Sequence, residues 1–207
     1  MSEIDYGKPL REQDVEADPL RQFALWYEEA AAAGVRMPEA MAVATASADG
    51  FPSVRMVLMK AFDERGFVFF TNYSSRKGSE LEANPRAALL FHWDPLGRQV
   101  RITGPVERTS AAETAAYVCT RPRGSQLSAL ASPQSEVVES RERLERGVVE
   151  LEERYGGGEL PVPEGWGGFR VAAEEMEFWQ QRHDRLHDRL RYRRGQDGGW
   201  RIERLAP

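Results

Sequence analysis

Cysteine, lysine and long apolar runs are all scarce in this chain of 207 residues. The single cysteine, Cys119, has no second cysteine with which to form an internal disulfide or a paired-cysteine zinc site, so a secreted, disulfide-stapled domain is excluded. The longest apolar runs, such as Ala87–Phe91, reach about five residues, whereas a membrane-spanning helix needs about 20. Residues 1–13 carry charges where a signal peptide is apolar. We therefore expect a soluble cytoplasmic protein with no membrane partner.

Positive charge is also in deficit, because 28 Lys and Arg face 33 Asp and Glu for a net charge of −5. A general nucleic-acid-binding protein needs an excess of cations on one face, so we expect no nucleic-acid partner. The phosphate-loop, dinucleotide-binding, nucleophile-elbow and H-E-x-x-H motifs are absent. His183 and His187 stand four residues apart, but two histidines without a third ligand more commonly form a surface pair, so we predict no metal.

The apolar pattern predicts a mainly β (α+β) fold, an antiparallel sheet or barrel with peripheral helices. We expect one domain over residues 18–207 after an N-terminal arm of residues 1–17. Asp18 and Pro19 cap and open a helix of about 14 residues. Alternating runs predict strands over 41–47, 53–62, 67–72, 86–93, 99–106, 169–173, 175–180, 190–194 and 200–205. Capping and breaking residues predict further helices over 75–83, 110–118, 125–131 and 140–155, with an irregular segment at 161–168.

The segment 182–189 has the most unusual charge pattern of the chain. If it is extended, Arg185, His187 and Arg189 share one face, and three neighbouring cationic or ionisable groups repel one another. An oxyanion such as phosphate would relieve this repulsion through charge-assisted hydrogen bonds. The ordinary alternative is a solvated charged loop.

Two more basic clusters, 121–126 and 74–78, stand where helices are expected to begin. Each is either a phosphate site at a helix N-terminus or ordinary helix capping, and together the clusters suggest two separate phosphate groups. Arg55 and Lys60 interrupt an apolar strand, where an unpaired buried charge costs several kcal/mol. An interval of five residues places them on opposite faces of a straight strand, so we expect either a bulge or strand end there, or two parts of a ligand.

The ordered set of motifs resembles the pyridoxamine/pyridoxine 5′-phosphate oxidase family, the FMN enzymes of vitamin B6 metabolism. The most specific block is Glu177-Phe-Trp-Gln-Gln-Arg-His-Asp-Arg-Leu-His-Asp-Arg189, preceded by Trp166-Gly-Gly-Phe-Arg170. The earlier pieces, in the family's order, are Arg55-Met-Val-Leu-Met-Lys60, Ser75-Arg-Lys77, Arg98-Gln-Val100, Arg121-Pro-Arg-Gly-Ser-Gln126 and Gln134-Ser135. The resemblance covers residues from about 17 to 207. It implies a split β-barrel, assembled as a homodimer with FMN at the subunit interface.

The resemblance also implies a site. The expected flavin-binding residues, some of them from the partner chain, are Arg55, Met56, Val57, Leu58, Met59, Lys60, Phe70, Thr71, Arg76, Lys77, Gln99, Gln134, Ser135, Trp179 and Arg189. The expected substrate-binding residues are Lys60, Tyr117, Arg121 and Ser125 for the phosphate, and Arg185, Leu186 and His187 for the ring. Arg185 and His187 are the expected catalytic residues, through orientation and charge stabilisation. Two departures stand out: Phe70 replaces a common tyrosine, and the stretch before Tyr6, a residue that can cover the substrate, is short and acidic where relatives are often basic.

The implied reaction is oxidation of pyridoxamine or pyridoxine 5′-phosphate to pyridoxal 5′-phosphate, by hydride transfer to FMN with dioxygen reduced to hydrogen peroxide. In such an enzyme the cofactor carries the redox step and the protein supplies position and charge. Two alternatives remain: a split-barrel flavin or deazaflavin reductase with another substrate, and a protein that binds pyridoxal phosphate without turnover.

Overall fold

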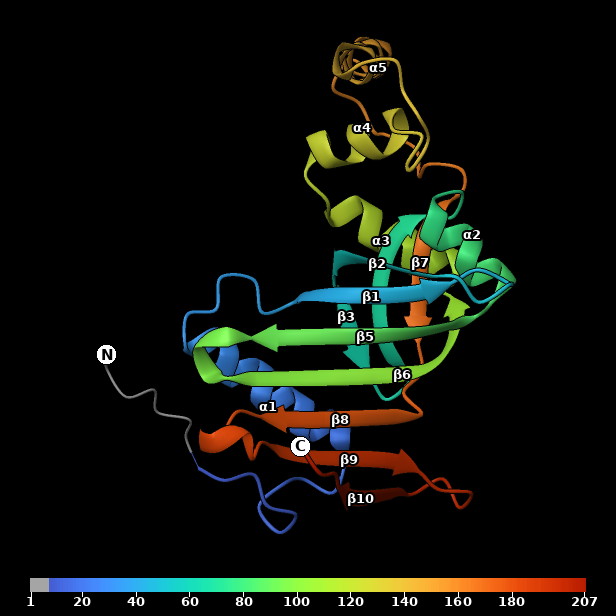
Figure 1. Cartoon of the computed structure of the whole chain (residues 1–207). Helices are drawn as coiled ribbons and strands as arrows, with labels where there is room; N and C mark the ends of the chain where they lie inside the picture. The colour runs from blue at the N-terminus through green and yellow to red at the C-terminus, as the bar shows by residue number, and fades with distance from the viewer. Residues whose placement is uncertain (1–7) are drawn as a thin grey trace.

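The protein, for which we use a computed structural model that describes residues 8–207, is built around a curled antiparallel sheet (Figure 1). Within those residues the main path of the sheet runs β10-β9-β8-β6-β5-β1-β2, and β3, β4 and β7 branch from it through β6. The strands are β1 (Ala40–Ala46), β2 (Pro52–Leu58), β3 (Ala61–Asp63), β4 (Gly66–Asn72), β5 (Arg86–Trp93), β6 (Arg98–Arg108), β7 (Trp166–Val171), β8 (Glu175–Gln180), β9 (Asp188–Arg194) and β10 (Trp200–Arg204).

Strand β6 is the point at which the sheet divides. Its first half pairs with β8, whereas its last residues pair with β7, beginning at Val106 opposite Val171. At the crossing, the backbones approach so closely that a Cβ on Gly104 would lie 1.7 Å from the carbonyl oxygen of Ala172. Only glycine fits this position, and the close approach lets one strand serve both branches. The mainly β, antiparallel fold predicted from the sequence is confirmed.

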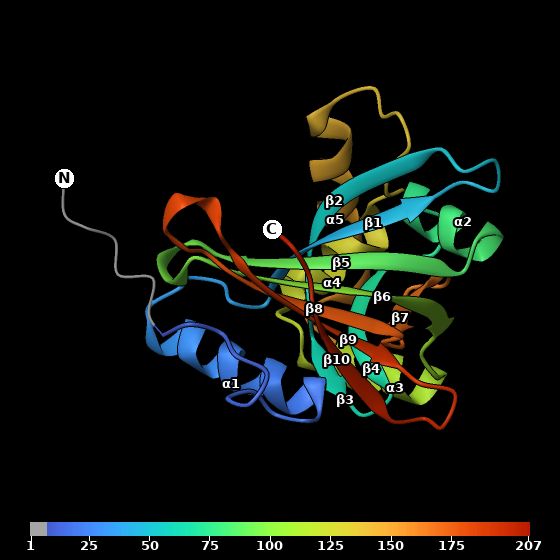
Figure 2. The same ribbon diagram turned by 60° about the horizontal axis from the view of Figure 1, so that its bottom comes forward.

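The helices lie around the sheet. They are α1 (Pro19–Ala32), α2 (Arg76–Ala83), α3 (Ala111–Thr120), α4 (Arg123–Ala131) and α5 (Arg141–Tyr155), with short 3₁₀ turns η1 (Asp94–Leu96) and η2 (His183–Arg185). Helix α1 begins as predicted, because Asp18 accepts the amide of Leu20 at 2.9 Å and proline occupies the first position. Figure 2 shows α1 lying along one face of the sheet. None of the helices within residues 8–207 is long and apolar enough to cross a bilayer.

Phe23 of α1 is the centre of the hydrophobic core. It is completely buried, and its ring meets Phe62, Phe67 and Phe91 edge-on at centroid distances of 4.9–5.0 Å. Edge-to-face packing of this kind adds to the gain from burial alone. The cluster joins α1 to strands β3, β4 and β5, so the helix and both branches of the sheet share one core.

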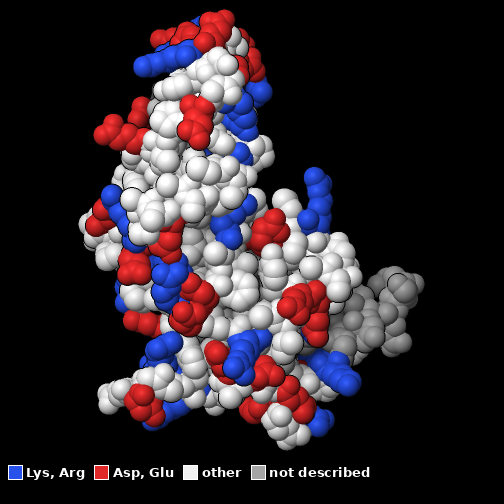
Figure 3. All heavy atoms as spheres, turned by 180° about the vertical axis from the view of Figure 1, so that it is seen from behind, with Lys and Arg blue, Asp and Glu red and all other residues white. Residues whose placement is uncertain are grey.

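Two further segments cover the ends of the molecule. Helices α4 and α5 stack on one another away from the sheet (Figure 1), and α5 buries none of its residues. In Figure 3 acidic and basic side chains are interspersed over this end. Residues 8–17 run across β9 and β10, where the backbone carbonyl of Glu16 accepts the Tyr192 hydroxyl at 2.8 Å and the Glu12 carboxylate pairs with Arg204 at 2.9 Å. The expected cover by Tyr6 lies outside the described residues.

The long strand predicted over residues 53–62 is two strands. Strand β2 ends at Leu58, after which the amide of Met59 bonds the carbonyl of Glu39 and the amide of Lys60 bonds the carbonyl of Val68. The chain therefore changes its pairing partner from β1 to β4 between these two amides, and a strand cannot run straight through such a change. The strand end, one of the expected alternatives, therefore lies between Arg55 and Lys60, and the alternation of one straight strand does not apply to this pair.

One other predicted segment was wrong, and one that the sequence left open is now determined. Strand β7 begins at Trp166, inside the segment expected to be irregular, because Trp166–Gly168 pairs with β4; the two glycines of this stretch give no alternating pattern. The segment 182–189 is not extended throughout. Gln180 of β8 pairs with Asp188 of β9, so residues 181–187 form the connection of a hairpin and include η2.

A substitution in the core tests this packing. We expect Phe23→Ala to lower the free energy of unfolding by about 3–5 kcal/mol, because it removes a fully buried ring from four packed elements. Leu25→Ala on the same helix, where the side chain is 45% exposed, is the control and should change stability by less than about 0.5 kcal/mol. Urea-induced unfolding measures both. Equal effects of the two variants would contradict the assignment of Phe23 to the core.

Candidate functional site

The first turn of α2 brings the predicted cation cluster together. Ser75 caps the helix by accepting the amide of Gly78 at 3.3 Å, and its hydroxyl donates to the carbonyl of Asn72 at 2.6 Å. Gly78 is required, because a Cβ there would lie 2.1 Å from the carbonyl oxygen of Tyr73. Arg76 and Lys77 therefore stand at a helix N-terminus, where the amide dipoles also favour an anion.

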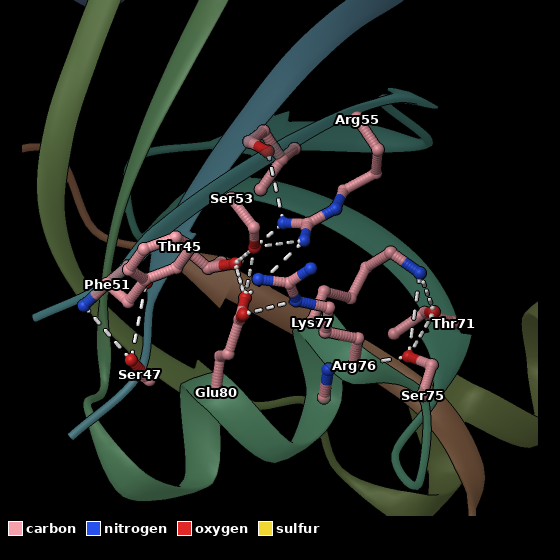
Figure 4. Close-up of polar contacts among 12 residues, drawn as sticks. Thr45, Ser47, Phe51, Ser53, Arg55, Thr71, Ser75, Arg76, Lys77 and Glu80 are labelled. Carbon is pink, nitrogen blue, oxygen red and sulfur yellow. Dashed lines mark hydrogen bonds and ion pairs between the residues drawn. The ribbon is translucent and has the colours of Figure 1, made fainter. Parts of the chain in front are cut away.

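Glu80 holds two of the cations in place (Figure 4). This carboxylate is 6% exposed and accepts hydrogen bonds from Thr45 and Ser53, which face each other across β1 and β2. Nε of Arg76 donates to it at 2.9 Å, and Nη2 of Arg55 lies 3.4 Å away. Burial by itself raises the pKa of Glu80, but these hydrogen bonds and the charge of Arg55 outweigh burial and lower the pKa from 4.5 to about 2.

Lys77 differs from the two arginines because its ammonium contacts neutral acceptors. The residue is 8% exposed, and Nζ donates to Thr71 Oγ1 and Gln134 Oε1, both at 3.0 Å. Burial and the charge of Arg55 lower its pKa, against an opposing effect of Glu80. Three cations and one carboxylate leave the cluster with a charge of about +2, which matches a phosphate monoester of about −1.5 to −2. The donor set therefore fits a phosphate group.

A second basic position, Arg121, lies at the C-terminal end of α3. Tyr117 stacks on Phe70 of β4 with centroids 4.0 Å apart, and the Arg121 guanidinium lies 4.7 Å from the ring centre of Trp166 on β7. Within residues 8–207, Nη1 of Arg121 is buried and has no hydrogen-bond partner. Burial lowers the pKa of Arg121, and the Tyr117 hydroxyl opposes this shift. A buried, unpaired guanidinium nitrogen is costly and fits an anionic ligand.

A third group forms a row across three strands. Gln99 of β6 lies opposite Trp179 of β8, and Trp179 lies opposite Arg189 of β9. Glu177, which is 2% exposed, accepts Nε of Arg189 at 2.8 Å and Nη2 at 3.2 Å. This two-point contact fixes the plane of the guanidinium beside the indole.

The β8–β9 connection carries the predicted catalytic residues. The His187 ring lies 4.6 Å from the Trp179 ring, and its Nδ1 accepts the backbone amide of Arg182 at 3.1 Å. A neutral His187 therefore carries its proton on Nε2. Arg185 has a left-handed backbone with φ of 61°, an uncommon state for a residue with a side chain. Ser135, another predicted site residue, also has a left-handed backbone, with φ of 75°. Residues with this uncommon backbone conformation concentrate at functional sites.

The cation cluster at α2 and the row formed by Gln99, Trp179 and Arg189 lie on opposite faces of the sheet. Arg55 lies opposite Val43, which lies opposite Leu89 of β5, so these three residues share the core-facing side. Gln99 lies opposite His92, an odd number of residues from Leu89 along β5, so this pair faces outward. The groups are also near opposite ends of the strands, with α2 at one end and the β8–β9 connection at the other (Figures 1 and 2). One small molecule cannot contact both groups in the same chain.

The remaining predicted residues differ in their burial. Lys60 and Leu186 are exposed, Ser125 is half-buried near the start of α4, and Met59 is buried in the core. Along β2, Val57 and Leu58 are half-buried, whereas Met56 points outward and is 65% exposed. Arg123, the second guanidinium of the 121–126 cluster, donates from Nε to Glu152 at 3.0 Å and from Nη1 to the Gly158 carbonyl at 2.6 Å, so it ties α4 to α5.

Sequence reasoning missed the carboxylates that hold the cations. Glu80 and Glu177 are both buried, yet neither was singled out for a role. For Glu177 a signal existed, because the acidic residue interrupts an apolar strand beside Phe178 and Trp179. For Glu80 the contacts come from β1, β2 and α2, and only the pairing of the strands brings these together.

Comparison with known proteins gives a consistent family. The protein family described as Pyridoxamine 5′-phosphate oxidase matches residues 27–155. The family described as Pyridoxine 5′-phosphate oxidase C-terminal dimerisation region matches residues 166–207. The chain is 59% identical over 198 residues to a pyridoxine/pyridoxamine 5′-phosphate oxidase of Rubrobacter xylanophilus, covering 96% of this chain and 91% of the relative. A protein of the same name from Ralstonia pickettii is 56% identical over 204 residues, covering 98% and 96%.

Solved structures agree on the fold. PhzG from Burkholderia lata, in complex with tetrahydrophenazine-1-carboxylic acid, matches with a TM-score of 0.90 and 35% identity over 96% of this chain and 98% of its own. An FMN binding protein of Nostoc punctiforme shares the fold with a TM-score of 0.71 at 17% identity. The predicted split barrel is therefore confirmed.

The lowered pKa of Glu80 predicts a pH dependence of stability. Because the folded pKa lies below the unfolded one, Glu80 contributes stability above about pH 4.5, and this contribution is lost as the pH falls toward about 2. As the pH falls over this range, the free energy of unfolding of the parent should decrease by roughly 2–3 kcal/mol more than that of Glu80→Gln. Glu82→Gln, on the exposed side of the same helix, is the control and should follow the parent. Identical acid profiles for all three proteins would contradict the role of Glu80.

Proposed function

The chain belongs to the pyridoxamine 5′-phosphate oxidase family, and on that premise we propose that it oxidises pyridoxamine 5′-phosphate and pyridoxine 5′-phosphate to pyridoxal 5′-phosphate. FMN is the cofactor, and the protein is an FMN-binding oxidoreductase of this type. The bound cofactor would supply a hydride acceptor for the carbon that bears the amine or alcohol, with dioxygen as the final electron acceptor and hydrogen peroxide as its product. The amine reaction also consumes water and releases ammonia.

The observation that carries the substrate assignment is Arg121. Its Nη1 is buried without a partner in the described part of the chain, and its guanidinium is fixed over the Trp166 ring. A phosphate oxygen would supply the missing acceptor, with the Tyr117 hydroxyl beside it. Lys60 and Ser125 are the further phosphate ligands of this proposal. A substrate without phosphate leaves the buried nitrogen unpaired, which costs binding free energy.

The cluster at α2 is the proposed site of the FMN phosphate. Its charge of about +2 and the helix N-terminus both favour a dianion. Lys77 carries most of this argument, since its buried ammonium has no carboxylate among its hydrogen-bond partners in residues 8–207. Gln134 lies against the same ammonium. Arg55, in β2, and Lys60, after the end of that strand, would hold the flavin ring in this proposal.

We assign the row formed by Gln99, Trp179 and Arg189 to the flavin of a second copy of the chain. These residues face outward, so a homodimer can bring them to the partner's α2. The match of residues 166–207 to a dimerisation region supports this assembly. So does an apolar hollow of about 400 Å³ on the same outward face, lined in part by Ala42, Val54 and Leu90. The apolar side chains that line the hollow become buried only when a second protein surface covers it.

His187 and Arg185 are assigned to the substrate ring and its developing charge. Nε2 of His187 is a donor while the ring is neutral, so it can hold a substrate oxygen but cannot accept a proton there. This favours a role in orientation over one as general base. Arg185, with its left-handed backbone, is the last residue of η2 and is followed by Leu186.

The bound ligand of PhzG raises a second candidate, the oxidation of a tricyclic carboxylic acid. Identity of 59% to a named pyridoxine/pyridoxamine 5′-phosphate oxidase, against 35% to PhzG, favours the phosphorylated vitamer. The two candidates differ in the anion and in ring size, so the same assay with both substrates separates them.

The decisive assay is the absorbance of the holoprotein in the absence of oxygen. We expect pyridoxamine 5′-phosphate to bleach the visible flavin band, and added oxygen to restore it with formation of hydrogen peroxide. Unphosphorylated pyridoxamine should bleach the band at least about 100-fold more slowly, since it leaves Arg121 unpaired. Faster bleaching by tetrahydrophenazine-1-carboxylic acid would favour the second candidate.

Two variants separate cofactor binding from turnover in this assay. Arg185→Ala should keep bound FMN but bleach more slowly by about 100-fold or more, because it removes a group placed at the substrate. Lys77→Ala should lose FMN on dilution, as measured by flavin fluorescence. Equal loss of FMN in both variants would contradict this division of roles.

A further inference from the structure

Helix α3 faces the β4–β7 pair through side chains spaced four residues apart. Glu113 contacts Arg170, Tyr117 stacks on Phe70, and Arg121 lies over Trp166. Four helical residues rise about 6 Å, and two strand residues about 6.6 Å, so the helix and β7 stay in step while running in opposite directions. The contact at residue 113 therefore determines where the side chains at 117 and 121 lie along the sheet.

The contact between Glu113 and Arg170 is an ion pair inside the fold. The Arg170 side chain is 5% exposed, and it donates from Nη2 to Glu113 Oε1 at 2.8 Å and from Nη1 to Asp63 Oδ1 at 2.7 Å. Arg65, whose side chain is 56% exposed, contacts the same two carboxylates from the solvent side at 2.8 and 3.1 Å. A buried guanidinium that loses a carboxylate partner is costly, so this pair resists sliding of the helix.

Glu113 also fixes the start of the helix. Its Oε2 accepts the amide of Ser110 at 3.0 Å, while the Ser110 hydroxyl accepts the amide of Glu113 at 3.1 Å, which is a complete capping box. The two carboxylate oxygens thus have different tasks. Oε2 caps the N-terminus of the helix, and Oε1 attaches that N-terminus to β7 through Arg170 and to the turn between β3 and β4 through Arg65.

We propose that Glu113 and Arg170 are positioning residues for the phosphate of the substrate. Their ion pair sets the position of α3 along β7 and so holds the Arg121 guanidinium and the Tyr117 hydroxyl where the phosphate binds. This inference rests on the proposed function, in which those two residues receive the phosphate. Glu113 and Arg170 touch neither substrate nor FMN in this proposal, and they affect only the affinity for the substrate.

The test compares two charge-removing variants of one network. Glu113→Gln keeps the capping box, because glutamine also serves at that position, but removes the charge that faces Arg170. Arg65→Gln removes a charge from the exposed side and leaves the contact with β7 intact. We expect Glu113→Gln to raise KM for pyridoxamine 5′-phosphate by about 5- to 10-fold, with kcat changed less than about 2-fold. Arg65→Gln should match the parent in both constants.

Two further measurements separate positioning from a general loss of structure. The inhibition constant of inorganic phosphate should rise in Glu113→Gln by the same factor as KM, while the dissociation constant of FMN from the apoprotein stays at the parental value. Arg170→Lys, which keeps the charge but not the two-point contact, should lie between the parent and Glu113→Gln. It also provides the test if Glu113→Gln does not fold.

A coupling test completes the experiment. In an Arg121→Met background, Glu113→Gln should raise KM by a smaller factor than in the parent, because part of its effect passes through Arg121 and only the rest through Tyr117. An unchanged KM in Glu113→Gln, or parallel losses of FMN affinity, kcat and KM, would overturn the inference. If the parent does not turn over pyridoxamine 5′-phosphate at all, the proposed function fails instead, which is a separate outcome.

Discussion

The alternation of side chains along a β-strand is the constraint on which this structure depends. Successive residues leave opposite faces, so the pairing register decides which groups can meet one ligand. Here the register places Arg55 on the core-facing side of the sheet and the row from Gln99 to Arg189 on the outward side. The proposed flavin site therefore needs two chains, and dimer formation and catalysis become one requirement.

The cations of the structure fall into two kinds: those paired with a carboxylate of the fold, and those without such a partner among the described residues, which we assign to ligands. Arg55 and Arg76 are held by Glu80, Arg189 by Glu177, and Arg170 by Glu113 and Asp63, as the contacts above describe. Each carboxylate fixes a guanidinium in direction and offsets part of the cost of burial. Lys77 and Arg121 instead meet neutral groups or, at one nitrogen of Arg121, no described partner. These two cations are the ones that we assign to the two phosphates.

The sequence predicted the elements well where local patterns are strong. Helix α1 and strands β5 and β8 lie where the capping residues and alternation predicted them. The errors have a common cause in long-range pairing: the break at Met59–Lys60 marks a change of partner strand, and β7 begins at Trp166 because this residue pairs with Asn72 of β4. The site residues came from resemblance to a family, whereas the carboxylates that hold them became visible only when the strands were paired.

The divided site can be tested by mixing two inactive variants. Lys77→Ala and Arg185→Ala each damage a different half of the site, so either homodimer has two defective sites. Each site takes Lys77 from one chain and Arg185 from the other. In a heterodimer of the two variants, one site therefore contains both substitutions and the other site contains neither. Coexpression at equal amounts should restore about one quarter of the parental oxidase activity, because half of the dimers then carry one intact site of two. If the mixture shows only the sum of the two variants' residual activities, the site is not shared between two chains, and the account is wrong.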